Sequence, residues 1–217
     1  DGTPIASLAE LQGVAAAATG GAAAALTTIS AYAQNNGGTA PVAADYTAAG
    51  VTGIGGAGQP TVAQINAALA DADVIGTAAD STAEVQGIVD AYRAILGNAD
   101  GTANNATSPS AADYTKLGVT GIDTAAELGL LGDVIDGKTA ADVATPAQIQ
   151  ALADAAAATV AYDGTNTAPT QAQLEALGVT GLTADNLAAV LAAIDAANSD
   201  GTPIASLAEL QGVAAAA

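Results

Sequence analysis

The chain has 217 residues, 51% of them hydrophobic, and contains no Cys, His, Met, Trp or Phe. The absence of Cys and His excludes disulfides, thiol chemistry and histidine-based catalysis or metal binding. Three cationic residues against 22 Asp and Glu give a net charge of −19, which excludes nucleic-acid binding and disfavours contact with an anionic membrane surface.

The sequence contains no run of about 20 strongly apolar residues, the length that a membrane-spanning helix needs. The nearest run, Gly13–Ile29, is rich in Ala, Gly and Thr. The mean hydropathy of +0.38 reflects mainly the many alanines. We therefore expect no membrane insertion in this segment.

The chain begins and ends with the same eighteen residues, DGTPIASLAELQGVAAAA, at Asp1–Ala18 and Asp200–Ala217. The two copies are offset by 199 residues, and the chain begins with Asp rather than Met. Repetition at a fixed offset is typical of tandem arrays. We therefore expect the chain to be a slightly oversized single period cut from a longer array.

Seven places carry a Ser or Thr followed three residues later by Glu or Gln, the pattern of a capping box that begins a helix. In chain order the pairs are Ser7/Glu10, Thr61/Gln64, Ser81/Glu84, Thr124/Glu127, Thr145/Gln148, Thr170/Gln173 and Ser206/Glu209. Apolar residues then recur with the helical period, as at Val85, Ile88 and Val89. No segment shows the strict alternation of a strand, so the sequence predicts an all-α fold.

The string GVTG occurs three times and predicts a helix end. Its first two residues are Gly50 and Val51, Gly118 and Val119, and Gly178 and Val179. We expect each Gly in the left-handed conformation just after a helix, and each Val against the apolar residue of the last turn, which is Tyr46, Tyr114 or Leu174. A phosphate-binding loop is the functional alternative, but no Lys stands at the spacing that a Walker motif requires.

The helix starts and ends predict an elongated tandem array of small three-helix bundles joined by short polar linkers. Residues 1–36 are expected to be the third helix of a preceding unit, with bundles at 37–99, 100–163 and 164–217, the last with a truncated third helix. The expected helices lie near 5–34, 41–49, 61–72, 81–97, 110–117, 124–136, 145–161, 170–177, 183–197 and 206–217. The sequence leaves open whether the first helix breaks at Gly20–Gly21 and whether it docks on the first bundle.

Acidic residues provide the remaining candidates for a site. Asp71 and Asp73 suggest a calcium loop, but positions 5 and 12 of an EF-hand fall on Ile75 and Thr82, so the motif fails. The triplet DGT recurs at Asp1, Asp100, Asp163 and Asp200 and predicts turns, with adventitious calcium binding as the alternative. We expect no enzymatic activity, no metal site and no cofactor.

The tyrosines are expected to serve packing. Tyr46 and Tyr114 occupy the position that Leu174 takes in the third copy, which indicates a place in the core. Tyr32 and Tyr162 stand at helix ends before linkers, where they can pack between units or stack on a ligand.

The third copy, TQAQLEALGVTGLTADNLAAVLAAIDAA at Thr170–Ala197, resembles the start of a GA module, a three-helix bundle of bacterial surface proteins. The matching residues are Leu174, Gly178, Val179, Thr180, Asn186 and Leu187. The segments Gln59–Asp71 and Ser81–Tyr92 are similar to the GA-like repeats of giant RTX-type adhesins. This resemblance covers nearly the whole chain through short helix-capping motifs.

The resemblance implies a structural spacer on the bacterial cell surface. Such repeats project the binding tip of an adhesin in cell adhesion and biofilm formation, and their partners are neighbouring repeats of the same chain. The segment itself is then expected to be extracellular and monomeric. The alternative is a GA-type module that binds a host protein such as serum albumin through its second helix. The second helices here present mainly Ala and Asp, without the aromatic and cationic anchors that dominate interfaces.

Overall fold

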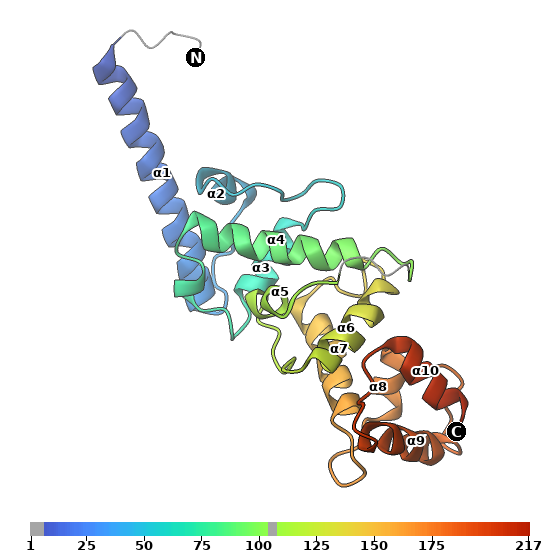
Figure 1. Ribbon diagram of the computed structural model, residues 1–217. Helices are drawn as coiled ribbons and strands as arrows, with labels where there is room; N and C mark the ends of the chain where they lie inside the picture. The colour runs from blue at the N-terminus through green and yellow to red at the C-terminus, as the bar shows by residue number, and fades with distance from the viewer. Residues whose placement is uncertain (1–6, 104–107) are drawn as a thin grey trace. The chain divides into compact units, whose positions relative to one another are not determined.

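A computed structural model describes residues 7–103 and 108–217, and these residues form helices, turns and loops without any strand (Figure 1). The prediction of an all-α fold is therefore confirmed. The first DGT triplet at Asp1 and the expected start of the first helix at Ile5 lie outside the described residues.

The chain divides into two compact units, Asp1–Asp90 and Ala91–Ala217, and the division falls within one helix, α4. The first unit contains α1 (Leu8–Gln34), α2 (Ala43–Ala48), α3 (Val62–Leu69), the 3-10 turn η1 (Gly76–Ala78) and the first half of α4 (Thr82–Asn98). The second unit contains the rest of α4 and then α5 (Ala111–Lys116), α6 (Ala125–Asp136), α7 (Pro146–Val160), α8 (Gln171–Ala176), α9 (Leu187–Ser199) and α10 (Leu207–Ala215).

These helices lie where the caps and apolar periods predict them, apart from the start of α9. Helix α1 runs through Gly20–Gly21 without a break, a point that the sequence left open. Helix α9 begins at Leu187 instead of near residue 183, and residues 184–186 form a turn before it. Reciprocal hydrogen bonds hold this turn: the Thr183 N–H donates to the Asn186 side-chain oxygen at 2.7 Å, and the Asn186 N–H donates to the Thr183 hydroxyl at 3.3 Å.

Capping boxes begin most of these helices. Both hydrogen bonds of the box are present at Ser7, Thr61, Ser81, Thr124 and Thr170. At Thr145 the Gln148 N–H donates to the Thr145 hydroxyl at 3.3 Å, but the Gln148 side-chain oxygen accepts from that hydroxyl, at 3.1 Å, rather than from the Thr145 N–H. At Ser206 the Glu209 carboxylate accepts from the N–H of Ala205, at 2.8 Å, rather than from Ser206 itself.

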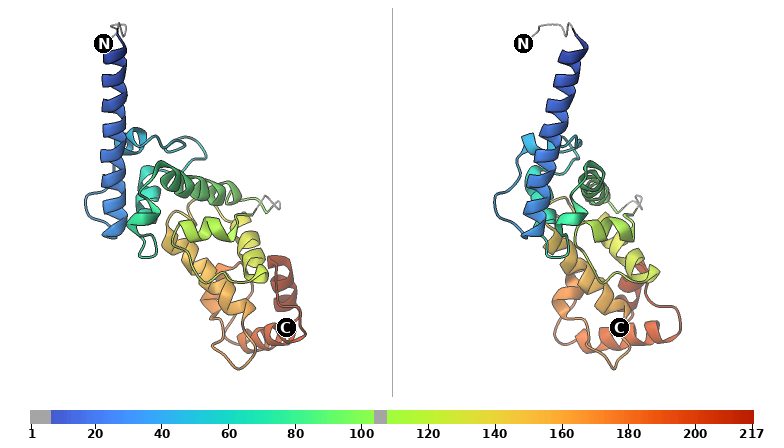
Figure 2. Two further views of the ribbon diagram at one scale, coloured as in Figure 1. Left: turned by 60° about the vertical axis from the view of Figure 1, so that its left-hand side comes forward. Right: turned by 90° about the vertical axis from the view of Figure 1, so that its left-hand side faces the viewer.

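In the first unit, the C-terminal half of α1 packs against α2, α3 and η1. Its buried side chains, Ala25, Ile29 and Ala33, recur at the helical spacing of four residues. The N-terminal half of the same helix extends beyond the other elements of this unit, and every residue from Ser7 to Gly21 is exposed (Figure 2).

In the second unit, α6 packs against α7 and α10, α7 packs against α8, and α9 packs against α10. Leu130, Leu131, Val134 and Ile135 of α6 are almost wholly buried. Polar side chains fix the loops around this core. The Tyr92 hydroxyl donates to the carbonyl of Val143 at 3.0 Å, which ties α4 to the loop before α7.

The contact between α1 and η1 predicts a glycine requirement. A Cβ atom at Gly76 would lie 2.8 Å from the Ser30 carbonyl oxygen and 2.9 Å from Cβ of Gln34. Gly76→Ala is therefore expected to lower the free energy of unfolding of the first unit by about 1–3 kcal/mol, the usual cost of overpacking. Thermal melts followed by circular dichroism measure this loss. Gly21→Ala is the control: nothing lies within 4 Å of its Cβ position, so no loss is expected. Equal melting temperatures for both variants would contradict the contact.

Candidate functional site

The three GVTG turns share one backbone geometry at the ends of α2, α5 and α8. Gly50, Gly118 and Gly178 have φ of 79°, 81° and 99°, the left-handed region that glycine adopts without steric cost. The following N–H groups donate to the carbonyls of Tyr46, Tyr114 and Leu174 at 2.9, 3.1 and 3.0 Å. Each Gly N–H bonds to the carbonyl three residues earlier. These two bonds define a Schellman motif.

The side chains around each turn are buried. Val51, Val119 and Val179 are 6%, 2% and 3% exposed. The residues in the last turn of each preceding helix, Tyr46, Tyr114 and Leu174, are at most 2% exposed. The turn therefore reverses the chain and also places an apolar pair in the core.

A glutamine from a later helix holds each turn, and this interaction was not predicted. In the first copy, the Gln86 carboxamide of α4 accepts from the Thr52 N–H at 2.9 Å and donates to the Thr52 carbonyl at 3.2 Å. In the second copy, Gln150 of α7 makes the same two bonds with Thr120, at 2.9 and 3.1 Å. In the third, the Gln211 amide of α10 donates to the Gly178 carbonyl at 3.2 Å. We call this arrangement the glutamine clamp.

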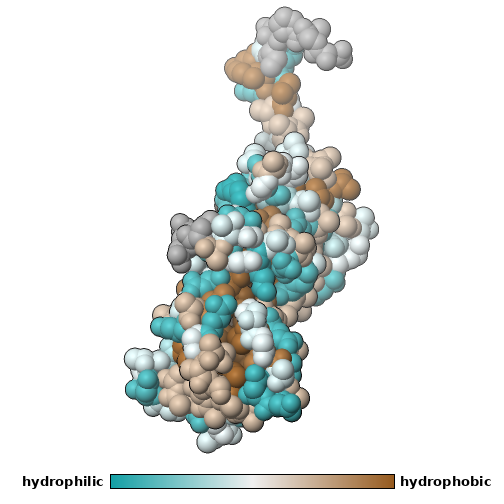
Figure 3. All heavy atoms as spheres, turned by 90° about the vertical axis from the view of Figure 1, so that its right-hand side faces the viewer, coloured by the Kyte–Doolittle hydropathy of each residue, from teal (hydrophilic) through white to brown (hydrophobic). Residues whose placement is uncertain are grey.

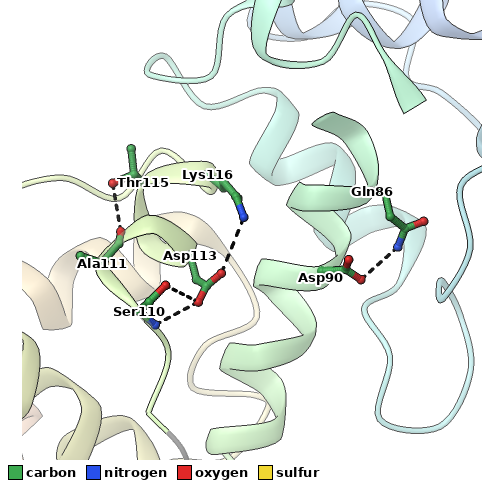
Figure 4. Close-up of polar contacts among 7 residues, drawn as sticks. All are labelled: Gln86, Asp90, Ser110, Ala111, Asp113, Thr115 and Lys116. Carbon is green, nitrogen blue, oxygen red and sulfur yellow. Dashed lines mark hydrogen bonds and ion pairs between the residues drawn. The ribbon is translucent and has the colours of Figure 1, made fainter. Parts of the chain in front are cut away.

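An aspartate one helical turn later orients two of these glutamines. Figure 4 shows the Gln86 amide donating to Asp90, at 3.0 Å. The Gln150 amide donates to Asp154 at 2.6 Å. The sequence carries a signal for the clamp, because each clamping glutamine stands five residues after the helix cap, at Ser81, Thr145 and Ser206.

The first residues of α5 are fixed by a carboxylate rather than by a clamp. In Figure 4 the Asp113 side chain accepts from the Ser110 N–H at 2.9 Å and from the Ser110 hydroxyl at 2.7 Å. Lys116 forms an ion pair with Asp113 at 3.9 Å. Both groups are partly exposed, so the pair contributes little to stability.

The two buried tyrosines differ in their polar partners. The Tyr46 hydroxyl donates to the Asn66 carboxamide oxygen, and the Asn66 amide donates to the Pro41 carbonyl at 2.9 Å. The Tyr114 hydroxyl is buried and has no hydrogen-bond partner among the residues that the structure describes. The position in α6 that corresponds to Asn66, five residues after the cap, is Gly129. Burial raises the pKa of both phenols above the ordinary value.

Gly129 is required by the approach of another segment. A Cβ atom there would lie only 2.5 Å from the Ala205 carbonyl oxygen, in the loop that leads into α10. No side chain can therefore reach from this position to Tyr114.

Small hollows lie beside the first two turns. One of about 340 Å³ is lined by Tyr46, Val51 and Ile54 among others, and one of about 170 Å³ by Tyr114, Val119 and Ile122. Ligand sites combine apolar walls with a few convergent polar or charged groups. These hollows are lined mainly by small and apolar residues of the turns, with Asp123 as the one acidic residue in the smaller hollow.

The acidic residues of the described chain do not gather into a metal site. No group of three or more Asp or Glu side chains suited to a metal ion occurs in residues 7–103 and 108–217. The DGT carboxylates instead close turns. Asp100, Asp163 and Asp200 accept from the backbone N–H two residues later at 2.8, 2.9 and 2.9 Å.

Helix α1 alone, among the described helices, is long and apolar enough to cross a bilayer. Length and composition are the whole of this argument, and core helices and signal sequences pass the same test. Its C-terminal half packs on α2, α3 and η1 through Ala25, Ile29 and Ala33. The C-terminal half of the helix is therefore part of the core of the first unit.

No protein family, curated protein or solved structure matches the chain. The functional argument therefore rests on its own residues. The turns and clamps position helices.

The two tyrosines form a matched pair for a stability test. Tyr46→Phe removes a hydrogen bond and leaves the Asn66 oxygen without its donor, so it is expected to cost about 1 kcal/mol. Tyr114→Phe removes a hydroxyl that has no partner in residues 7–103 and 108–217, and it is expected to be neutral or stabilising. Urea unfolding of both variants measures the difference. A larger loss for Tyr114→Phe than for Tyr46→Phe would show that the hydroxyl environments are wrongly assigned.

The DGT turns predict a pH effect. The backbone N–H and then the hydroxyl of Thr165 lower the pKa of Asp163, with help from the Asn166 N–H. A carboxyl with a depressed folded-state pKa stabilises the fold at neutral pH, and this contribution is lost as pH falls from the unfolded value of about 3.9 through the folded one. Thr165→Val removes the hydroxyl bond and is expected to raise the pKa of Asp163. Carbon-detected NMR titration of the Asp163 carboxyl measures this pKa. An unchanged pKa in the variant would contradict the hydrogen bond from the Thr165 hydroxyl to Asp163.

Proposed function

We propose that this chain is a structural spacer of a large bacterial cell-surface adhesin, an elongated tandem array of three-helix bundles that projects a binding tip from the cell. The observation that carries the proposal is the threefold recurrence of one turn-and-clamp device, at Thr52, Thr120 and Gly178. A spacer needs the same joint repeated, and this device recurs once in each expected bundle.

The clamp supports the assignment of bundles to residues 37–99, 100–163 and 164–217. In each of these segments it joins the turn after the first helix to the third helix, and the second helix lies between them in sequence. A short first helix bound to a long third helix closes a three-helix unit. The Schellman turn sets the angle at which the chain enters the second helix.

The charge of the chain suits a spacer. A net charge of −19, with acidic side chains on helices as well as loops, makes neighbouring copies repel one another and keeps a long array soluble. An extracellular array also gains from the absence of Cys and Met, which are the residues most open to oxidation. We propose that the chain acts without enzymatic activity or a cofactor, and that its partners are neighbouring repeats.

Binding of serum albumin through a second helix has no specific support in this chain. In the second copy, the corresponding helix α6 buries Leu130, Leu131, Val134 and Ile135 within its own unit. Aromatic and cationic anchors, which dominate interface energetics, are nearly absent from the sequence. Albumin binding is therefore the alternative to the spacer role, and a binding experiment tests it below.

Small-angle scattering tests the spacer role. The two-copy chain, residues 1–217 followed by residues 19–217, continues the sequence because Ala217 is the counterpart of Ala18. A compact 217-residue protein has a radius of gyration of about 17 Å. We expect a larger value for the single chain, and a maximum dimension that nearly doubles in the two-copy chain. Compact envelopes for both proteins would overturn the spacer role.

Surface plasmon resonance tests the alternative with the same two proteins. No saturable binding of serum albumin at roughly tens of micromolar is expected, with or without calcium, because the chain lacks interface anchors. The two-copy chain is the matched control, since a true albumin site would appear twice in it and double the binding stoichiometry. Saturable binding would move the function to the GA-type module.

A further inference from the structure

The same eighteen residues occupy two different environments in this chain. At the C-terminus, Leu210 of α10 is wholly buried. Its counterpart near the N-terminus is Leu11 of α1, which is 51% exposed. Leu207 and Val213 are half-buried, whereas their counterparts Leu8 and Val14 are 69% and 56% exposed. Because the sequences are identical, the difference lies in what surrounds them.

The C-terminal copy is held by a defined surface, which we call the α10 seat: Gly129 and Asp133 of α6, Gly178 after α8, and Asn198 of α9. Leu207 donates its N–H to the Asp133 carboxylate at 3.2 Å, and Leu207 also lies beside Gly178. The Asn198 carboxamide oxygen accepts from the Ile204 N–H at 3.0 Å. The seat thus contacts the first turn of α10, its apolar face and the backbone of the segment before it.

The glutamine clamp belongs to the same recognition. Gln211 of α10 binds the Gly178 carbonyl, and its counterpart in α1 is Gln12. Gln12 stands five residues after the cap Ser7, the spacing found in all three clamping helices. The start of α1 therefore carries the cap, the apolar stripe and the glutamine of a clamping helix, although its side chains from Ser7 to Gly21 are exposed.

The exposed apolar side chains at the start of α1 form one stripe. Leu8, Leu11 and Val14 recur every three residues, so they lie along one side of the helix. Figure 3 shows apolar side chains gathered on this projecting part of the helix. Large exposed apolar groups that cluster in this way mark an interaction surface.

We infer that the N-terminal half of α1 docks on the α10 seat of a second copy of this chain. The occupant is identified by sequence: a helix with these same letters already fills that seat in this chain, with Leu210 wholly buried in it. Successive copies then share one helix, which serves as α10 of one copy and α1 of the next. The inference deepens the proposed spacer function, on which it rests for the existence of neighbouring copies.

The length of α1 permits both uses at once. The helix has 27 residues, about 40 Å at 1.5 Å per residue. Leu11 belongs to the part that docks on the other copy, and Ala25 begins the part that is buried in its own unit. These positions are separated by about 21 Å along the axis, so the two cores need not compete for the same turns. Helix α4 already contributes residues to two compact units in this way.

Single cysteines test the inference, because the chain contains none. In the single chain, a Leu11→Cys variant is expected to react rapidly with a water-soluble maleimide, and a Leu210→Cys variant at least about tenfold more slowly, since its reaction requires local opening. In the two-copy chain, Leu210→Cys lies at the junction, where one helix must serve both copies. We expect it to stay as slow as in the single chain. Labelling as fast as at Leu11 would overturn the shared helix.

A second pair of variants protects the test against misfolding. In the two-copy chain, Leu207→Cys is placed in the first copy, so that the cysteine lies in the helix at the junction. Adding Leu210→Asp places a charge in the seat and is expected to restore rapid labelling. Adding the same change at the free end, Leu11→Asp, is the matched control and is expected to leave labelling slow. Rapid labelling in all three proteins would show that the junction helix never occupies the seat.

The competing occupants give different results. If phosphatidylcholine vesicles slow the labelling of Leu11→Cys in the single chain while the junction of the two-copy chain stays reactive, the stripe binds membranes and the inference is wrong. Albumin binding would remove the spacer function without changing the labelling of the junction. Failure of the spacer function and failure of the shared helix are therefore distinguishable.

Discussion

The glutamine clamp is the interaction on which the arrangement of helices depends. Helices α2, α5 and α8 have six residues each, far too few to be stable in isolation. Each ends at a left-handed glycine, and in the first two copies the next backbone amide and carbonyl bind one carboxamide from a long helix. Because Gln86 and Gln150 both donate and accept, they fix the height and the rotation of the long helix against the turn. Each of these short helices is thereby held in place through the turn at its C-terminal end.

Polar side chains align the helices in this chain, a role that large apolar side chains usually have. With five Tyr as the only aromatic residues and a core rich in Ala, each buried residue excludes little surface, so apolar packing alone specifies alignment weakly. Hydrogen bonds to backbone carbonyls supply the missing specificity. Asn98 donates to Gly132 at 2.9 Å, and Asn198 binds the carbonyls of Thr159 and Tyr162 at 2.8 and 2.9 Å. Each bond fixes one element against another at a single register.

Local signals explain what the sequence could and could not predict. Capping boxes and Schellman glycines act within six residues, so the helix ends and the turns at Gly50, Gly118 and Gly178 were readable from spacing alone. The clamp joins residues about 30 positions apart, and the regular place of its glutamines has no meaning until the fold is known. The contrast between Tyr46 and Tyr114 depends on Ala205, a residue from a distant loop, which no local pattern reveals.

The placement of the cations has a consequence for proteolysis. Trypsin-like proteases cut after Lys or Arg, and this chain offers only three such bonds. Arg93 lies inside α4, Lys116 ends α5 beside Asp113, and the Lys138 ammonium group binds the Ala176 carbonyl at 2.6 Å. Such proteases need a locally unfolded segment, which the open loops provide and folded helices do not. Among the described loops, only the one after α6 carries a cation, Lys138, so these loops offer such a protease a single bond.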